Sequence, residues 1–298
     1  LTLKPGLFTN QGRDAAGTVW LDSLGVAAST CTDFHPTAML LPRPALLTRP
    51  HGSHKGSYGD VAVIGGAPGM TGAAVLAATA ALRSGSGRVF IHLLASGTLD
   101  VDVMHPELMF RSASALDYSS MVVVCGCGGG VAVQTLLPDI LKATAPLVID
   151  ADALNAIAID VQLQKALLDR STRLSSTVLT PHPLEAARLL GMTAKQVQDD
   201  RLLAAQTLSQ RFGCTVVLKG SGSIIAAPQR LPMINPTGNA RLATAGTGDV
   251  LAGMVGAQLA TGKCGFDAAC AAVYQHGEQA DNWLTHTPLT ASRMLHNI

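Results

Sequence analysis

Short apolar runs alternate along the chain with longer segments in which apolar residues recur at helical spacing. The runs typical of strands cover residues 61–64, 88–93, 121–125, 147–149, 177–179 and 215–218. The helical pattern covers residues 71–84, 131–143, 152–157, 162–170, 183–190, 194–212 and 249–261. This succession predicts an α/β fold with a central, mostly parallel sheet. Because the strands are apolar on both sides, helices are expected on both faces of the sheet.

The glycine-rich and polar motifs follow the predicted strands. In an open α/β sheet, ligands bind outside the carboxyl ends of the strands. The motifs are therefore expected to form one composite site.

The most informative motif is Ala-Gly-Thr-Gly at 245–248, which leads into an apolar helix expected to open with Asp249. Glycines let backbone N–H groups approach an anion, and a helix N-terminus adds partial positive charge. Gly246, Thr247 and Gly248 thus form a candidate anion hole. Asp249 beside it is a candidate general base, and the alternative is that it only caps the helix.

Three further strand ends carry candidate residues with open alternatives. Asp150 and Asp152 could contact a magnesium-bound water or a nucleotide, or Asp152 could cap the next helix. His182 and Glu185 could face one cleft, whereas Glu185 alone would balance the helix dipole. The loop 219–223, Lys-Gly-Ser-Gly-Ser, could wrap a nucleotide phosphate or form a tight hairpin turn.

Composition narrows the function classes. Of 298 residues, 48% are hydrophobic and 14% are charged, and 21 basic against 20 acidic residues give a net charge of +1. This balance indicates no nucleic-acid or membrane-surface partner. No apolar run approaches the ~20 residues of a membrane span. The six cysteines contain no Cys-x-x-Cys pair and predict buried free thiols in a reducing cytoplasm.

The first 50 residues differ from the rest. Residues 1–8 are expected to form a strand with a turn. Residues 33–50 contain four prolines, which predict a linker or an extended arm. The chain begins with Leu1 instead of Met and is expected to be a trimmed fragment.

In combination, the motifs resemble those of the ADP/ATP-dependent NAD(P)H-hydrate dehydratases, whose domain is ribokinase-like. In chain order they are His-Lys-Gly at 54–56, Gly-Gly at 65–66 with Thr-Gly-Ala at 71–73, Ala-Ala-Leu-Arg-x-Gly-x-Gly at 80–87, Asp-Ala-Asp-Ala-Leu-Asn at 150–155, Thr-Pro-His-Pro-x-Glu at 180–185, Leu-Lys-Gly at 218–220, and Thr-Gly-Asn at 237–239 with Gly-x-Gly-Asp at 246–249. Each motif is weak alone, but seven in order are specific.

The resemblance also suggests a domain organisation. Residues 1–26 are similar to the closing strands of the NAD(P)H-hydrate epimerase domain that is often fused upstream. Residues 1–45 are therefore expected to be the end of that domain with a linker, and residues 46–298 the dehydratase domain. The chain would then be the C-terminal part of a two-activity protein.

The resemblance implies a cytoplasmic repair enzyme that uses ADP or ATP with Mg²⁺. It would remove water from the S-epimer of hydrated NADH or NADPH and release AMP or ADP with phosphate. Phosphorylating the hydroxyl of the hydrate would turn a poor leaving group into a good one. Relatives also imply a homo-oligomer, a tetramer.

Matching positions carry the family's roles onto this chain. Asp249 would be the general base. The resemblance assigns the substrate contacts to Ala73, Gly130, His182 and Asp249. It assigns binding of the adenine nucleotide to Lys219, Gly220, Ser221, Gly222, Ser223 and Gly248. It assigns the anion hole to Gly246, Thr247 and Gly248, and a water-mediated magnesium contact to Glu185.

Some positions depart from the family pattern. Gly-Cys-Gly-Gly-Gly at 126–130 replaces an expected Gly-Pro-Gly-Leu-Gly. Met70 stands where Tyr is frequent, and Leu184 replaces a frequent Gly. Arg-Leu at 241–242 stands near an expected Gly-Met. None of these changes removes a charged catalytic group.

Two alternative interpretations remain. A vitamin or sugar-alcohol kinase of the same superfamily would use the same phosphate loop, but such kinases usually carry Asn where His182 stands. A non-catalytic nucleotide-binding regulator would tolerate the loss of Asp249, whereas the enzyme would not.

Overall fold

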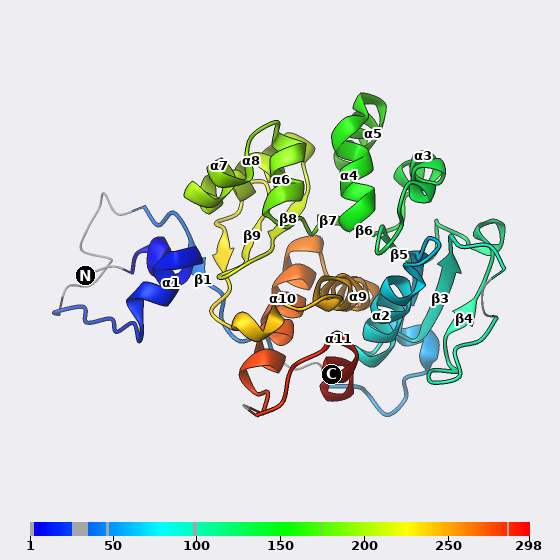
Figure 1. Ribbon diagram of the computed structural model, residues 1–298, viewed down its shortest axis with the longest axis horizontal. Coiled ribbons are helices and arrows are strands. Elements are labelled where there is room, and N and C mark those ends of the chain that lie inside the picture. Colours follow the sequence, from blue (N-terminus) through cyan, green and yellow to red (C-terminus); the bar gives the residue numbers. More distant parts are fainter. Residues whose placement is uncertain (1–2, 26–34, 46–47, 98–99, 174, 285) are drawn as a thin grey trace.

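The computed structural model describes residues 3–25, 35–45, 48–97, 100–173, 175–284 and 286–298. Their strands form one sheet in the order β1-β10-β9-β8-β7-β6-β5-β2-β3-β4 (Figure 1). The strands are β1 (Met39–Leu40), β2 (Asp60–Gly65), β3 (Arg88–Leu93), β4 (Met109–Phe110), β5 (Val122–Cys125), β6 (Leu147–Ile149), β7 (Thr177–Leu179), β8 (Thr215–Leu218), β9 (Ile224–Ala226) and β10 (Met233–Ile234). Only β9 runs antiparallel to its two neighbours among these pairs. The predicted mostly parallel α/β sheet is therefore confirmed.

Helices cover both faces of the sheet, as the sequence predicted (Figure 1). One face carries α2 (Thr71–Arg83), α9 (Thr247–Ala260), α10 (Gly265–Asp281) and α11 (Ala291–Met294). The other face carries α3 (Leu137–Lys142), α4 (Ala151–Ile159), α5 (Val161–Thr172), α6 (Pro183–Leu190), α7 (Ala194–Asp199) and α8 (Arg201–Phe212). A further helix, α1 (Asn10–Ala16), lies near the β1 end of the sheet (Figure 1).

The strands bury both of their faces because successive side chains point to opposite sides. Val61 and Val63 of β2 belong to the core under α2 and α9, whereas Ala62 and Ile64 belong to the core under the other helices. The same division holds along the central strands. This is why these strands are apolar throughout instead of alternating.

Two predicted helices differ in detail. The segment 194–212 is interrupted at Asp200, whose carboxylate accepts a hydrogen bond from the Leu203 N–H and starts α8 as a separate helix. The segment 131–143 begins as a 3-10 turn and becomes α-helical at Leu137, where Pro138 follows in the first turn. Helix α10 was not predicted.

The described part of the first 50 residues corrects one expectation. Pro5–Phe8 forms a 3-10 turn followed by α1, so the predicted strand is wrong there. Within the predicted linker or extended arm, Met39–Leu40 pairs with β10 as an edge strand. Residues 1–2, 26–34 and 46–47 lie outside the described part.

The cysteines are mostly as predicted. Cys125, Cys127, Cys214 and Cys270 are buried free thiols, whereas Cys264 is an exposed one. Cys31 lies outside the described residues. Within the described ranges, no helix is long and apolar enough to cross a membrane.

Candidate active site

The predicted site residues gather at the carboxyl edge of the sheet. They occupy the loops after β2, β5, β6, β7 and β8, and α9 begins at the same edge. They share this edge because the carboxyl ends of adjacent parallel strands meet there. Whether they act as one composite site stays a prediction.

The start of α9 has the geometry of an anion hole. Helix α9 begins at Thr247, and Gly246 adopts a left-handed φ of 88° at the N-cap. A Cβ at Gly246 would lie 2.6 Å from Leu76 Cδ1, so both backbone and space favour glycine. No described side chain caps the helix, which leaves its first N–H groups for a ligand. Asp249 is the third helical residue, so the expectation that it opens or caps the helix is wrong.

Hydrogen bonds of Thr247 hold the turn that forms the anion hole. The Thr247 hydroxyl lies 2.8 Å from the Leu242 carbonyl oxygen and 3.0 Å from that of Thr244. The Thr247 carbonyl accepts a 2.8 Å hydrogen bond from His276 Nε2. Burial lowers the pKa of His276 to about 4, so its ring is neutral at pH 7. His276 comes from α10 and was missed because that helix was not predicted.

Behind the anion hole, Asp150 and Lys219 form a buried ion pair. Lys219 Nζ lies 2.7 Å from Asp150 Oδ1, and the Thr180 hydroxyl donates to the same oxygen at 2.8 Å. Burial by itself would lower the pKa of Lys219, but the charges of Asp150 and Glu185 outweigh it and raise this pKa. Asp150 thus pairs with a lysine, which neither the magnesium-water nor the nucleotide interpretation included.

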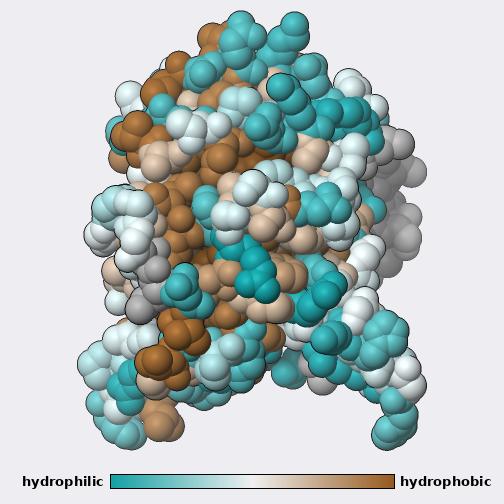
Figure 2. Space-filling view, turned by 90° about the vertical axis from the view of Figure 1, so that its right-hand side faces the viewer, coloured by the Kyte–Doolittle hydropathy of each residue, from teal (hydrophilic) through white to brown (hydrophobic). Residues whose placement is uncertain are grey.

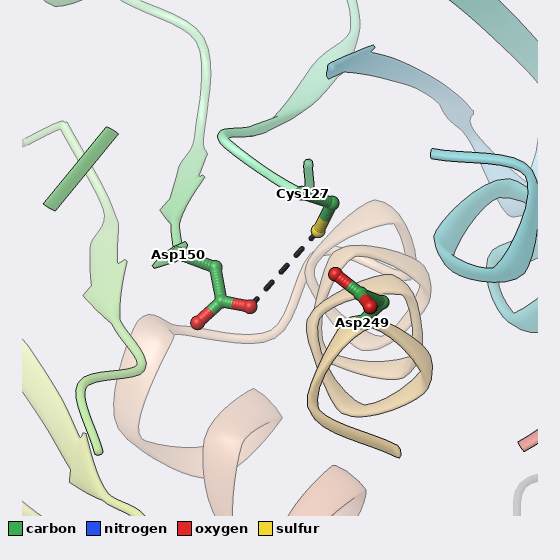
Figure 3. A group of neighbouring side chains, drawn as sticks. All are labelled: Cys127, Asp150 and Asp249. Atoms are coloured by element: carbon green, nitrogen blue, oxygen red, sulfur yellow. Dashed lines mark hydrogen bonds between the residues drawn. The ribbon is translucent and has the colours of Figure 1, made fainter. Parts of the chain in front are cut away.

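Asp249 lies near Asp150, with the buried Cys127 thiol next to both carboxylates (Figure 3). One ligand atom each from Cys127, Asp150 and Asp249 lies within 4.8 Å of the other two. Burial raises the pKa of Asp249 to about 6, and the charge of Asp150 adds to this effect. The Lys219 ammonium already neutralises Asp150, and a thiol is a poor ligand for Mg²⁺. The cluster therefore suits proton transfer better than metal binding.

His182 and Glu185 form a reciprocal capping box at the start of α6. His182 Nδ1 accepts from the Leu184 N–H at 3.1 Å, and Glu185 Oε2 accepts from the His182 N–H at 2.8 Å. The Glu185 carboxylate is buried, whereas the His182 side chain is 46% exposed, and neither residue is among those that line the cavity described below. Burial would raise the pKa of Glu185, but hydrogen bonds from His182 and the charge of Lys219 lower it. The capping interpretation is therefore confirmed for this pair, and the cleft interpretation stays a prediction.

The loops that carry Ala73 and Gly130 interlock. Gly66 N–H donates to the Cys127 carbonyl at 3.0 Å, and a Cβ at Gly128 would lie 2.8 Å from the Ala73 Cβ. Asp152 Oδ2 accepts a 2.8 Å hydrogen bond from the Gly130 N–H. Asp152 therefore anchors Gly130, and the interpretation of Asp152 as a cap is wrong because Asp150 occupies the N-cap position.

A cavity of about 570 Å³ opens from the anion hole toward the β8–β9 hairpin. Of the predicted nucleotide residues, it is lined by Lys219, Gly220, Ser221, Ser223 and Gly248. The loop is thus both a hairpin turn and a cavity wall. Gly222 does not line the cavity, because it lies against the Phe8 carbonyl, which a Cβ would approach to 1.9 Å.

The outer wall of this cavity comes from the N-terminal segment. Asn10 N–H donates to the Ser221 carbonyl at 3.1 Å. The Arg13 guanidinium donates to the carbonyls of Pro236 and Gly238 at 2.7 and 2.9 Å, and Arg13 and Asp14 line the cavity. These residues were not predicted, because no sequence motif marks them.

Figure 2 shows one face of the molecule, on which apolar and polar side chains are interspersed.

Comparisons with known proteins show the family of the chain. The family model of the NAD(P)H-hydrate dehydratases matches residues 61–298. The ADP-dependent (S)-NAD(P)H-hydrate dehydratase of Neisseria meningitidis is 44% identical over 82% of this chain and 83% of that protein. The bifunctional NAD(P)H-hydrate repair enzyme Nnr of Escherichia coli is 36% identical over 94% of this chain, which spans 55% of that protein.

A solved structure matches as well. It is an ADP/ATP-dependent NAD(P)H-hydrate dehydratase from Bacillus subtilis, co-crystallised with ATP and Mg²⁺. The TM-score is 0.70 at 30% identity, over 84% of this chain and 91% of that one. The ribokinase-like fold expected from the motifs is thereby confirmed.

Proposed function

The chain belongs to the NAD(P)H-hydrate dehydratase family, and we propose that it dehydrates the S-epimer of hydrated NADH or NADPH at the expense of ADP or ATP. The observation that carries the proposal is the position of Asp249. It lies in the first turn of α9, behind the Gly246 N-cap, and the nucleotide-sized cavity opens beside it. A partly buried carboxylate with a raised pKa at that point suits a general base.

The proposed reaction has two steps. The Asp249 carboxylate takes the proton of the hydrate's hydroxyl while the oxygen bonds to the terminal phosphorus of the nucleotide. AMP leaves from ADP, or ADP from ATP. The new phosphate ester then breaks at its C–O bond, driven by the ring nitrogen's electron pair, and loss of a proton from the adjacent carbon restores the dihydronicotinamide.

The chain's own groups would stabilise the phosphoryl group during its transfer. The N–H groups that open α9 supply an anion hole. Lys219 supplies a positive charge beside Gly248, where a Cβ would lie 3.3 Å from its Nζ. The hairpin residues Gly220, Ser221 and Ser223 would follow the rest of the nucleotide along the cavity.

We propose that Ala73, Gly130 and His182 contact the dinucleotide. Their support is that the loops of Ala73 and Gly130 interlock next to Cys127, which faces Asp249. The exposed His182 ring is at the next strand end beyond Asp150, beside the Lys219 loop, where the Lys219 N–H donates to the Pro181 carbonyl at 2.9 Å.

Mg²⁺ would enter with the phosphates of the nucleotide, because Mg²⁺ is usually bound by phosphates with one or two carboxylates. Glu185 fits a water-mediated contact, since each of its oxygens keeps a lone pair after bonding to His182. The metal would supply charge neutralisation of the phosphates. Glu185 would orient the water molecules bound to the Mg²⁺.

The proposal also includes a cellular location, a fused upstream domain and an oligomeric state. A cytoplasmic location is supported by the free thiols of the described cysteines, which suit a reducing compartment. Fusion to an upstream epimerase domain is supported by the bifunctional relatives, of which this chain spans about half. A homo-oligomer stays a prediction that sedimentation can test.

The direct test is recovery of the reduced nicotinamide. Purified protein is incubated with hydrated NADH, Mg²⁺ and ADP or ATP, and the absorbance of the dihydronicotinamide band is followed. We expect recovery from the S-epimer only, and none without nucleotide. Absence of recovery, together with phosphorylation of a vitamin or sugar alcohol, would instead support the kinase.

A further inference from the structure

Two arginines in the described part of the chain are buried without a carboxylate as partner. Arg170 is 1% exposed and Arg201 is 4% exposed. Burial lowers the pKa of each guanidinium to about 10, so both are charged at pH 7. A buried charge is costly unless it is paired or hydrogen-bonded, so each arginine requires an explanation.

The contacts of Arg170 explain its burial. It lies in the last turn of α5, where the helix dipole favours a cation. Its guanidinium donates to the Thr177 hydroxyl at 2.9 Å and to the Ala145 carbonyl at 2.6 Å. It also donates to carbonyls at the end of α3, those of Ile140, Leu141 and Ala143. All three nitrogens are used, so Arg170 serves to join α3, α5 and β7.

Arg201 has a less favourable position. It is the first residue of α8, where the positive end of the helix dipole disfavours a cation. Its Nη1 donates to the Gln198 side chain at 2.7 Å, and its Nη2 donates to the carbonyls of Leu218 and Lys219, both at 3.2 Å. Its Nε is buried and has no hydrogen-bond partner among the described residues. Joining helices to the sheet does not explain an arginine in such a place.

The Arg201 guanidinium lies against the hairpin that forms one wall of the cavity. A Cβ at Gly220 would lie 2.9 Å from Nη1 and 3.0 Å from Nη2, so a side chain there would displace the guanidinium. Lys219 and Gly220 line the cavity, whereas Arg201 is not among its lining residues. Arg201 therefore contacts the hairpin from outside the cavity.

The hydrogen bond to the Lys219 carbonyl fixes the orientation of one peptide group. In a trans peptide, the carbonyl of one residue and the N–H of the next point in opposite directions. Because the Lys219 carbonyl is turned toward Arg201, the Gly220 N–H is turned away from it. Among the described residues this N–H has no hydrogen-bond partner, and Gly220 is exposed at the cavity. It is thus available to an anionic ligand.

We propose that Arg201 is a positioning residue for the nucleotide: it holds the Lys219 carbonyl and thereby keeps the Gly220 N–H turned toward the phosphates in the cavity. The inference rests on the nucleotide site of the proposed function. Gly220 has a φ of 134°, and without a Cβ its backbone rotates easily. The hydrogen bond from Arg201 opposes that rotation.

Calorimetric titration with ADP and Mg²⁺ tests this inference. Arg201→Met removes the donors, and the Kd for ADP should rise about tenfold, the size of one hydrogen bond to a charged group. Arg201→Lys keeps the charge and a donor without the planar fork, so the Kd should rise less, about threefold. At saturating ADP, kcat should stay within about twofold of the wild-type value, because only binding of the nucleotide is affected.

Arg170→Lys is the matched control for Arg201→Lys. Both variants replace a buried arginine that donates to backbone carbonyls, and both should lower the midpoint of thermal unfolding. Arg170 lies beside the amino end of β7, at the opposite edge of the sheet from the site, so its replacement should leave the Kd for ADP unchanged. The two lysine variants decide the outcome even if Arg201→Met does not fold.

The Gly220 N–H provides a second readout. In protein labelled with ¹⁵N-glycine, its NMR signal is assigned by its loss in Gly220→Ala. Addition of ADP should shift this amide proton in the wild type and in Arg170→Lys, and should shift it less in Arg201→Lys. A general loss of stability would not single out this signal.

The outcomes separate this inference from the proposed function. A Kd for ADP that is unchanged in both Arg201 variants, or that rises equally in Arg170→Lys, would overturn the inference. A wild-type protein that binds ADP but does not restore the dihydronicotinamide would overturn the proposed function alone, because the ADP titrations would still decide the role of Arg201.

Discussion

The two ends of the cleft are built differently. At the reacting end, Asp150 accepts short hydrogen bonds from Lys219 and Thr180 at neighbouring strand ends, and Asp249 lies next to Asp150 in the first turn of α9. At the nucleotide end, the wall consists of a hairpin and of the N-terminal segment, joined through backbone contacts at Ser221 and Gly222.

This difference suggests a division of labour. The reacting end contains buried charges whose pKa values are set by one another, so a single change there should alter the chemistry. The nucleotide end is a cavity whose outer wall comes from the N-terminal segment, so a change there should alter nucleotide affinity. The following variants test whether the two ends can be separated.

The largest effect is expected at Asp249. Asp249→Asn keeps the size of the side chain but removes the base, so turnover of the hydrated dinucleotide should fall by about 10²- to 10⁴-fold. The measurement is kcat from recovery of the dihydronicotinamide band. Turnover close to that of the wild type would show that another group accepts the proton.

A large loss of stability is expected at Lys219, which belongs to both ends. Lys219→Met leaves Asp150 buried without its cation, which should cost roughly 3–5 kcal/mol of unfolding free energy. The double variant Lys219→Met/Asp150→Asn removes the stranded charge and should recover much of that loss. Urea unfolding at pH 7 measures both. A single variant as stable as the wild type would mean that the pair is not buried as the structure has it.

The pH dependence of the reacting end follows from the raised pKa of Asp249. With this pKa at about 6 instead of 3.8, the base is protonated in a weakly acidic solution. The value of kcat/KM should therefore fall about tenfold per pH unit below pH 6. The protonated carboxyl is the form favoured in the folded state, so the contribution of Asp249 to stability is present below pH 3.8 and lost as the pH rises through 6. An acid limb near pH 4 would contradict this assignment.

The smallest effect is expected at the nucleotide end. Gly222 has a φ of 63°, and a Cβ there would lie 1.9 Å from the Phe8 carbonyl oxygen, so Gly222→Ala should displace the N-terminal segment. We expect the KM for ADP to rise several-fold, about 1 kcal/mol of binding, with kcat at saturation unchanged.

Gly262→Ala is the control for Gly222→Ala. Gly262 also has a positive φ, of 85°, but a Cβ there would have nothing within 4 Å. This variant should cost stability without changing the KM for ADP. Equal effects of the two variants on KM would argue that the N-terminal segment is no part of the nucleotide site.

Sequence and structure agree best where the signal is local. The central strands and the loops with Gly246, His182 and Lys219 were predicted because each motif carries its own local signal. Their meeting at one edge follows from parallel strand order. The role of Asp249 stays a prediction that its variants will test.

The contacts that could not be predicted from the sequence are long-range. Asp150 and Lys219 are 69 residues apart, and their pairing depends on the strand order β6-β7-β8. The Arg13 guanidinium donates a hydrogen bond to the carbonyl of Gly238, 225 residues away. Arg13 belongs to the N-terminal segment, of which residues 1–8 were predicted to be a strand with a turn. Cys127 was noted only as a departure from a pattern. Nothing local indicates that its thiol lies close to the carboxylates of Asp150 and Asp249.

The central claim is that chemistry and nucleotide binding are separable, and calorimetric titration of Asp249→Asn with ADP and Mg²⁺ tests it most directly. The Kd for ADP should stay within about threefold of the wild-type value, because the hairpin and cavity walls are intact. A Kd weakened tenfold or more, in step with the loss of turnover, would contradict the division between the two ends.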